Sequence, residues 1–367
     1  MYRRHFLQTA GALSAAAFLP KPALAQHLPF NPQAAEKWRT FEITTRVEVL
    51  VPGGTTRVWL PIPSVDTFYQ RSIDNAWSGN AAVATLLHER RYGAGIFYAE
   101  WPDSVNSPMV ELHSRFATRD RAVNFSARPG RIDELTPGQR ALYTEPTEHM
   151  PTDGIVRKTA RDITRGAVSD YQRAKAIYEW IVENTYRDPK TRGCGVGDIK
   201  AMLETGNLGG KCADLNALYV GLARAVGLPA RDVYGVRVAK SQFGYKSLGA
   251  GTANITRAQH CRAEVYLAGF GWVPVDPADV RKVVLEEKAQ PTNLSDPLVQ
   301  AVRPKLFGAW EMNWVAFNTA NDLTLPNAKG GNLTFFMYPQ AETHAGRADS
   351  LDPDNFKYTI TARELTA

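Results

Sequence analysis

The chain has 367 residues, of which 44% are hydrophobic, so it can bury a sizeable core and form two or three domains. Its formal net charge is +6, but it contains no dense run of lysine and arginine with interleaved aromatic residues, which argues against a nucleic-acid-binding protein. No stretch beyond the N-terminus is apolar for long enough to cross a membrane, and we therefore expect a mature protein without stable membrane insertion.

The N-terminus has the pattern of an export signal. Arg3 and Arg4 precede a mildly apolar run, and the tripeptide Ala-Leu-Ala precedes Gln26. Small residues of this kind are typical of a cleavage site, and paired arginines are typical of the twin-arginine route, although an ordinary secretory signal also begins with positive charge. We predict that residues 1–25 are a twin-arginine signal peptide, cleaved near Ala25, and that the mature protein is periplasmic. Cleavage would remove three basic residues and no acid, which lowers the formal charge from +6 to +3.

Residues 39–125 are expected to form an N-terminal β domain. Two β-rich runs flank the Pro-Gly-Gly sequence at 52–54, which is typical of a hairpin. Short strands at this spacing favour a small sandwich. The further strands expected are 82–88, 95–101 and 109–117. A stretch rich in proline and polar residues follows, and we interpret it as a linker between domains.

Residues 150–290 are expected to form an α+β core. Apolar residues recur at helical spacing between 155 and 186, and again after Cys212, until Gly227 and Pro229 stop the second helix. Strand-like runs then follow. Because helices come first and strands afterwards, the order predicts an α+β domain rather than alternating units. The remaining residues, 300–367, contain strand-like pieces and are expected to form a β-rich C-terminal extension.

Cys212 lies where the second helix is expected to begin. Unpaired backbone N–H groups and the helix dipole at that end favour a thiolate, which is the reactive form of cysteine, and the same N–H groups can hold an oxyanion. Gly209 and Gly210 would let a substrate approach closely. By itself the position is weak evidence, because a single cysteine at a helix start is more often a packed core residue.

A thiolate nucleophile needs a base, and the base needs an orienting group. His260 opens a strand-like run, and Asp276 ends the next one. If the two strands form a hairpin across the glycines at 269–271, the side chains of His260 and Asp276 can lie side by side. Taken separately, His260 can equally be a core histidine, and Asp276 a turn residue before Pro277.

Three segments together resemble the motifs of the transglutaminase-like superfamily: GGKCADLNALYVGLARAVGLPAR, QHCRAEVYL and GWVPVDP. The helical segment SDYQRAKAIYEWIVENTY resembles the helix that precedes the cysteine in that family, so the resemblance covers roughly residues 155–280. It implies a papain-like fold, in which a helix carrying the cysteine packs on an antiparallel sheet carrying histidine and aspartate. It also implies that Cys212 is the nucleophile, His260 the general base and then acid, and Asp276 the residue that orients the imidazole.

The reaction implied by the resemblance is acyl transfer through a thioester, without a metal or another cofactor. We expect the substrate to be a peptide or protein and the reaction to be hydrolysis of a peptide or amide bond. A crosslinking transglutaminase and a non-catalytic binding module of the envelope remain alternatives. The sequence leaves the oligomeric state open.

One residue departs from the family pattern. Many members have an aromatic residue two positions after the histidine, whereas this chain has Arg262. Because side chains alternate along a strand, Arg262 shares a face with His260. We predict that it faces the cleft and binds a substrate carboxylate; the alternative is an exposed arginine at a strand edge.

The cysteine count is odd, at three. If Cys212 must stay reduced in an oxidising compartment, Cys194 and Cys261 are the natural disulfide pair, and two buried free thiols are the alternative. A zinc site formed by the three cysteines and His260 is disfavoured, because no C-x-x-C pair exists and adjacent ligands suit shared coordination poorly.

Overall fold

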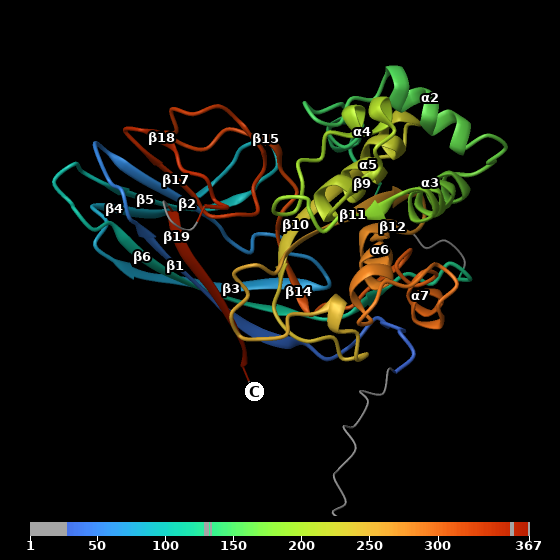
Figure 1. Ribbon diagram of the computed structural model, residues 1–367, viewed down its shortest axis with the longest axis horizontal. Coiled ribbons are helices and arrows are strands. Elements are labelled where there is room, and N and C mark those ends of the chain that lie inside the picture. Colours follow the sequence, from blue (N-terminus) through green and yellow to red (C-terminus); the bar gives the residue numbers. More distant parts are fainter. Residues whose placement is uncertain (1–27, 128–131, 133, 353–355, 366–367) are drawn as a thin grey trace, which may run out of the picture.

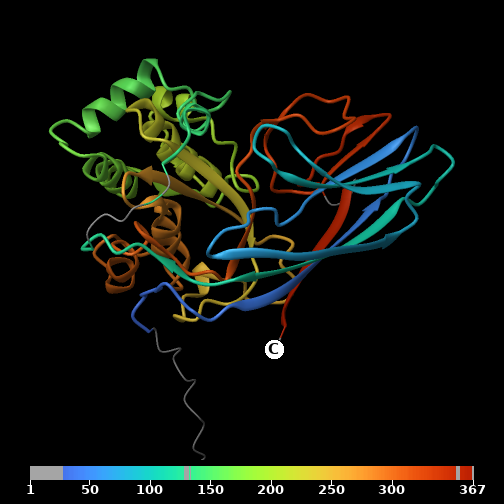
Figure 2. The ribbon, with the colours of Figure 1, turned by 180° about the vertical axis from the view of Figure 1, so that it is seen from behind.

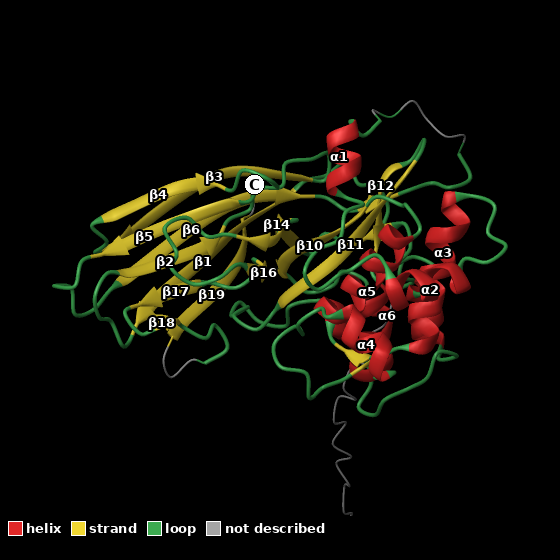
Figure 3. Ribbon diagram, turned by 90° about the horizontal axis from the view of Figure 1, so that it is seen from above, coloured by secondary structure: helices red, strands yellow, loops and turns green. Residues whose placement is uncertain are grey.

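The computed structural model describes residues 28–127, 132, 134–352 and 356–365. The signal peptide and cleavage site expected from the sequence lie outside the described residues. Within the described part, an all-β half lies beside a half that contains the helices (Figure 1). Figure 3 shows that the helices gather at one end of the molecule, while strands form the other end.

Two sheets packed face to face form the β half. The first has the order β19–β1–β6–β3, with β1 (Arg39–Val49), β3 (Gln70–Gly79), β6 (Met109–Thr118) and β19 (Phe356–Leu365). The second has the order β18–β17–β2–β5–β4, with β2 (Thr56–Pro61), β4 (Val83–His88), β5 (Gly95–Trp101), β17 (Gln340–Thr343) and β18 (Gly346–Arg347). Alternate side chains of the strands, such as Val110 and Leu112, point into the core that the two sheets share. The strands expected at 82–88, 95–101 and 109–117 are present, whereas β3 was not predicted.

The prediction of a hairpin across residues 52–54 is wrong. β1 pairs with β6 and β19, and β2 pairs with β5 and β17, so the two strands belong to different sheets. Both edges of β1 and of β2 are occupied by strands distant in sequence. The turn therefore carries the chain from one sheet to the other instead of joining neighbouring strands.

The C-terminal extension is β-rich, as predicted, but it is not a separate unit. β19 pairs with β1 from Thr40 to Val49, and β17 pairs with β2. Figure 2 shows the red C-terminal strand lying against the blue N-terminal strands. The N-terminal β region and the C-terminal extension therefore share one sandwich, which corrects the expectation of two units with separate boundaries.

The other half contains an antiparallel sheet of order β12–β11–β10–β14. Its strands are β10 (Ala230–Arg237), β11 (Gln259–Leu267), β12 (Gly271–Val275) and β14 (Trp314–Asn318). Helix α5 (Cys212–Ala225) packs on β10 and β11. The helices packed against α5 are α2 (Gly154–Ile163), α3 (Asp170–Asn184), α4 (Ile199–Thr205) and α6 (Pro277–Glu286). This arrangement confirms the papain-like α+β core.

Helix α5 is buried on almost every side because the sheet covers one face and helices cover the others. Its apolar residues Leu215, Leu218 and Leu222 have no exposed surface. The helix begins at Cys212, as the sequence predicts. Its first residue is therefore held in place by the largest hydrophobic cluster of the described chain.

Shorter elements connect these parts. They are β7 (Arg121–Ala122), α1 (Pro137–Leu142), β8 (Tyr186–Arg187), β9 (Gly209–Gly210), the 3₁₀ turn Lys246–Leu248, α7 (Pro297–Val302), β13 (Ala309–Trp310), β15 (Asn321–Leu323) and β16 (Leu333–Phe335). Helix α1 lies in the stretch expected to be a linker, and Thr136 caps it. None of the helices in the described ranges combines the length and the hydrophobicity of a membrane-spanning segment.

Candidate active site

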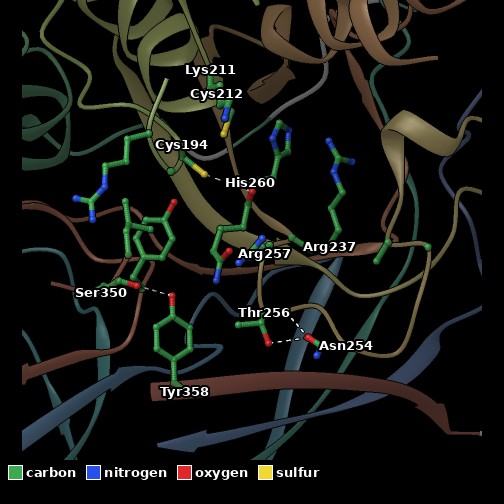
Figure 4. A pocket seen from close by; sticks show the side chains of 18 of the residues that line it. Cys194, Lys211, Cys212, Arg237, Asn254, Thr256, Arg257, His260, Ser350 and Tyr358 are labelled. Atoms are coloured by element: carbon green, nitrogen blue, oxygen red, sulfur yellow. Dashed lines mark hydrogen bonds between the residues drawn. The ribbon is translucent and has the colours of Figure 1, made fainter. Parts of the chain in front are cut away.

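Cys212 lies in a cavity of about 1010 Å³ between the two halves of the molecule. The core contributes Cys212 and His260 to the lining, and β19 of the β half contributes Tyr358 (Figure 4). Cys212 itself is only 3% exposed. The fold thus places the cysteine at the end of α5 that faces the cavity.

The hairpin expected across the glycines at 269–271 is present, and it places His260 beside Asp276. Strands β11 and β12 pair with Ala263 opposite Val275. Asp276 follows the end of β12, and its Oδ2 lies 2.8 Å from Nε2 of His260. His260 is 3% exposed and Asp276 is fully buried, so water competes little for this hydrogen bond.

The surroundings of Cys212 and His260 favour their charged forms. The pKa of the Cys212 thiol is lowered well below its usual value, because the thiols of Cys194 and Cys261 donate hydrogen bonds to the thiolate and His260 adds another, which outweighs burial. Burial and Arg237 would lower the pKa of His260, but the nearby carboxylates raise it to about 9. A thiolate–imidazolium pair is therefore the expected state at neutral pH.

Asp276 has a second role, as the N-cap of helix α6. Its Oδ1 accepts a hydrogen bond from the backbone N–H of Asp279 at 3.0 Å and lies 3.4 Å from the amide nitrogen of Asn216. The cap leaves Oδ2 free for His260. One carboxylate therefore fixes the start of a helix and the orientation of the imidazole at the same time.

The site also contains a second carboxylate, that of Asp279, and its partner Arg237, neither of which was predicted from the sequence. Oδ1 of Asp279 lies 3.4 Å from Nε2 of His260 and 2.5 Å from Nη2 of Arg237. Burial disfavours its ionised form, but Arg237 and His260 hold the pKa of Asp279 well below its usual range. The sequence contains a signal for Asp279. It is the third residue after Asp276, the N-cap of α6, and such a residue lies in the first turn of the helix, next to the cap.

Arg262 does not line the cavity, which contradicts the prediction that it binds substrate. Its guanidinium is buried over the rings of Trp310 and Trp314, at 5.2 and 4.8 Å from their centroids. Nη1 donates to the backbone oxygen of Glu311 at 3.0 Å, and Nε lies 3.5 Å from Oδ2 of Asp276. In the pairing of β11 with β12, Ala263 lies opposite Val275, so one residue further along Arg262 lies opposite Asp276. The guanidinium therefore points toward Asp276 and not into the cleft. The alternative of an exposed arginine is also wrong.

All three cysteines are free and buried, so the disulfide between Cys194 and Cys261 is not formed. Sγ of Cys194 lies 3.4 Å from the backbone oxygen of Gln259, and the residue lines the cavity together with Cys212. Figure 4 shows the sulfur atoms of Cys194 and Cys212 in the same space. The two other thiols thus surround the cysteine at the helix start instead of binding each other.

Among the described residues, His260, Asp276 and Asp279 could also hold a metal ion, since their ligand atoms lie within 4.8 Å of one another. The neighbouring cations argue against this use. Asp279 pairs with Arg237, and Arg262 lies beside Asp276. Two fixed positive charges already balance the carboxylates and would repel a metal ion.

The glycines near Cys212 make room for protein side chains, which corrects the expectation that they admit substrate. A Cβ added to Gly210 would lie 2.5 Å from Asp214, and one added to Gly209 would lie 2.3 Å from the ring of Tyr186. Oδ1 of Asp214 accepts the backbone N–H groups of Val196 and Gly197, both at 2.9 Å. Asp214 therefore fastens the loop before α4 to the head of α5.

Comparisons with known proteins place the chain in a family. A model described as the Transglutaminase-like superfamily matches residues 157–277. An uncharacterized protein of Haemophilus influenzae is 37% identical over 344 residues, which cover 89% of this chain and 91% of the relative.

Of two matching solved structures, only the first reaches a TM-score of 0.50. A candidate cysteine protease from Cytophaga hutchinsonii has a TM-score of 0.50 at 15% identity, and the match covers 89% of this chain and 98% of that one. The periplasmic domain of TgpA from Pseudomonas aeruginosa has a TM-score of 0.35 at 13% identity, over 71% of this chain and 92% of that one. At such identities the likeness of the first structure concerns the fold alone.

Proposed function

The chain belongs to the transglutaminase-like superfamily, and on this basis we propose that it is an exported enzyme that hydrolyses a peptide or amide bond through Cys212, His260 and Asp276. The observation that carries the proposal is the buried hydrogen bond of 2.8 Å between His260 and Asp276, beside a cysteine whose thiolate is stabilised. A structural histidine or a core cysteine would not require either feature.

In the proposed mechanism, the Cys212 thiolate attacks the carbonyl carbon of the scissile bond. The Ala213 N–H is already bonded to the backbone oxygen of Cys194 at 2.9 Å, so the Cys212 N–H at the start of α5 is the donor available for the oxyanion. His260 then gives its proton to the leaving amine, and a thioester with Cys212 remains. His260 next removes a proton from water, which attacks the thioester and releases the acid.

Asp276 holds the imidazole and stabilises its positive charge in this scheme. Asp279 adds a second negative charge beside the same nitrogen. Both carboxylates favour the protonated form of His260, which is the form that must reach the leaving amine. Burial opposes the ionised form of both acids, but Arg237 and His260 hold the pKa of Asp279 well below its usual range. Burial and Asp279 raise the pKa of Asp276, and His260 and Arg262 oppose that rise.

Hydrolysis is proposed in preference to crosslinking because water needs no binding site of its own. A crosslinking enzyme needs a second groove for an amine and must keep water away from the thioester. A non-catalytic binding module is the third possibility. The complete set of charged groups, at hydrogen-bonding distance and shielded from solvent, favours a catalytic role.

The proposed location is the periplasm, reached by the twin-arginine route. Arg3, Arg4 and the small residues before Gln26 support this proposal.

The test of the proposed reaction is mass spectrometry of peptides that carry glutamine or a terminal amide, incubated with the mature protein with and without a primary amine. Hydrolysis predicts a product of the acid mass in both incubations, and Cys212→Ala should reduce turnover to background. Incorporation of the amine as the main product would instead identify a transglutaminase. Full turnover by Cys212→Ala would disprove the cysteine mechanism.

A further inference from the structure

The cavity at Cys212 has a strongly positive lining. None of its described lining residues is an aspartate or a glutamate. Six lysine and arginine residues contribute to its lining: Arg187, Arg192, Lys211, Arg237, Arg257 and Lys282. Positive charge concentrated on one concave surface, with no acid in the lining, indicates an anionic ligand.

Four of these cations already have acidic partners outside the lining. Glu286 pairs with Arg187 and lies 3.7 Å from Lys282. Asp349 pairs with Arg192 at 2.6 Å, and Asp279 pairs with the buried Arg237 at 2.5 Å. Three carboxylates thus serve four cations, so the charge of these cations is already compensated in part.

The other two cations, Lys211 and Arg257, have no ion pair with any acid in the described part of the chain. Lys211 immediately precedes the nucleophile proposed here, and Arg257 precedes His260 by three residues. Figure 4 shows both side chains in the space that holds Cys212 and His260. Two unpaired cations therefore lie within a few residues of the reacting groups.

The loop that carries Arg257 is held in place by the β half. The N–H of Ile255 donates to the backbone oxygen of Ile360 at 2.8 Å, and the N–H of Ala362 donates to the oxygen of Ala253 at 2.9 Å. The hydroxyl of Thr256 accepts the N–H of Ile360, also at 2.8 Å. A cation on a fixed loop is preorganised, so a bound anion does not have to order the backbone.

We propose that the cavity selects acidic peptides, in which side-chain carboxylates near the scissile bond pair with Lys211 and Arg257. This inference rests on the proposed function in one respect: the acidic peptides are substrates only if the protein hydrolyses them. Their preferred binding to the cavity does not require turnover. Carboxylates fit better than a polyphosphate chain because the two unpaired cations are single groups on separate segments, not a continuous basic track.

The experiment measures binding and turnover separately. Binding is measured with Cys212→Ala and a fluorescein-labelled, end-capped peptide of alternating alanine and glutamate, against the same peptide with glutamine at each glutamate. We expect the acidic peptide to bind about tenfold more tightly at about 50 mM salt, and the ratio to shrink at about 300 mM salt because ions screen exposed charges. Equal affinities for the two peptides would overturn the proposal.

Variants of one cation assign the preference to the cavity. In the Cys212→Ala background, Arg257→Gln should weaken binding of the acidic peptide about fivefold, and Arg257→Lys should restore part of the loss. Arg90→Gln is the matched control, because Arg90 is exposed, lies in the turn between β4 and β5, and is absent from the cavity lining. An equal loss in Arg90→Gln would show that general surface charge, not the cavity, binds the peptide, and would reject the proposal.

Equally tight competition by a short single-stranded oligonucleotide would also reject the proposal, in favour of a nucleic-acid ligand.

Turnover by the wild-type protein separates this inference from the proposed function. Cleavage of the glutamate and glutamine peptides at equal rates, together with equal binding, would refute the acidic preference and leave the hydrolase intact. Selective binding without cleavage of any peptide would leave the acidic site intact and count against the hydrolase.

Discussion

Oδ1 of Asp279 lies 3.4 Å from Nε2 of His260, the same nitrogen that bonds to Asp276. The imidazole therefore faces two carboxylates. Nη2 of Arg237 pairs with the same Oδ1 of Asp279 at 2.5 Å, which keeps this second acid ionised in a buried position. Asp279 is thus placed to set the charge of His260 without touching a substrate.

This arrangement predicts the pH dependence of turnover. Burial and Arg237 oppose the charged imidazole, but Asp279 and Asp276 raise the pKa of His260 to about 9, so activity should fall as the pH rises through about 9 and His260 loses its proton. In Asp279→Asn one of these carboxylates is neutral, so the pKa of His260 should fall and the basic limb should move to lower pH. The measurement is kcat/KM against pH. Asp162→Asn, an exposed acid on α2, is the control, and identical basic limbs in Asp279→Asn and wild type would contradict the assignment.

Cys194 is predicted to control the reactivity of Cys212. Its thiol hydrogen bond is the largest influence that lowers the pKa of Cys212, so Cys194→Ala should raise that pKa. Cys194→Ser keeps an O–H donor and should change it less. The check is the rate of Cys212 alkylation by iodoacetamide across pH, followed on the peptide that contains Cys212 so that other thiols do not interfere. An unchanged profile in Cys194→Ala would show that the hydrogen bond does not stabilise the thiolate.

Asp276 is predicted to affect stability and activity through different oxygens. Asp276→Ala removes the α6 cap, worth about 1 kcal/mol, and also the buried partner of His260 and Arg262, so it should lower the free energy of unfolding by more than the cap alone, as well as turnover. Asp276→Asn keeps a capping oxygen but presents an amide to His260, so stability should fall less than in Asp276→Ala while turnover falls. Thermal unfolding and kcat measure the two effects. Ser169→Ala removes the N-cap of α3, away from the site, and should lower stability alone. Parallel losses of turnover in Ser169→Ala and Asp276→Ala would mean that loss of a helix cap explains both.

Arg262 is predicted to support Asp276 from inside the protein. Arg262→Met removes a buried cation and leaves the Glu311 oxygen and Asp276 without it, so the free energy of unfolding should fall by about 3–5 kcal/mol. Because burial raises the pKa of Asp276 and Arg262 opposes that rise, the acid limb of the turnover profile should also move to higher pH. Lys158→Met, which removes an exposed ion pair with Asp162 on α2, should cost about 0–1 kcal/mol. Similar unfolding energies for the two variants would refute the buried role.

Export is predicted to depend on the paired arginines. A reporter fused to residues 1–30 should reach the periplasm only in cells with a working twin-arginine system, and Arg3→Lys combined with Arg4→Lys should block it. Cell fractionation of the two fusions gives the readout. Unchanged export of the double variant would exclude this route and point to an ordinary secretory signal.

The sequence by itself determined the elements that carry the site, because their signals are local. Glycine and lysine before an apolar helical repeat predict a helix that begins at Cys212, and the structure has it there. The β run 259–267 and the glycine turn after it predict the hairpin that joins His260 to Asp276, and the observed strand β11 has those bounds. Periodicity and turn residues act over a few positions, so they can be read without knowing the rest of the chain.

Only the tertiary structure decided which segments meet across long distances in the sequence. The partners of β1 and β2 include strands from the C-terminal end, so no local pattern could reveal that the two strands separate into different sheets. Arg262 is buried because Trp310 and Trp314 arrive from a later segment and cover it. The gathering of Lys211 and Arg257 around Cys212 likewise requires the loop held by β19. Burial and charge at a position depend on everything packed against it, and that information exists only once distant segments have come together.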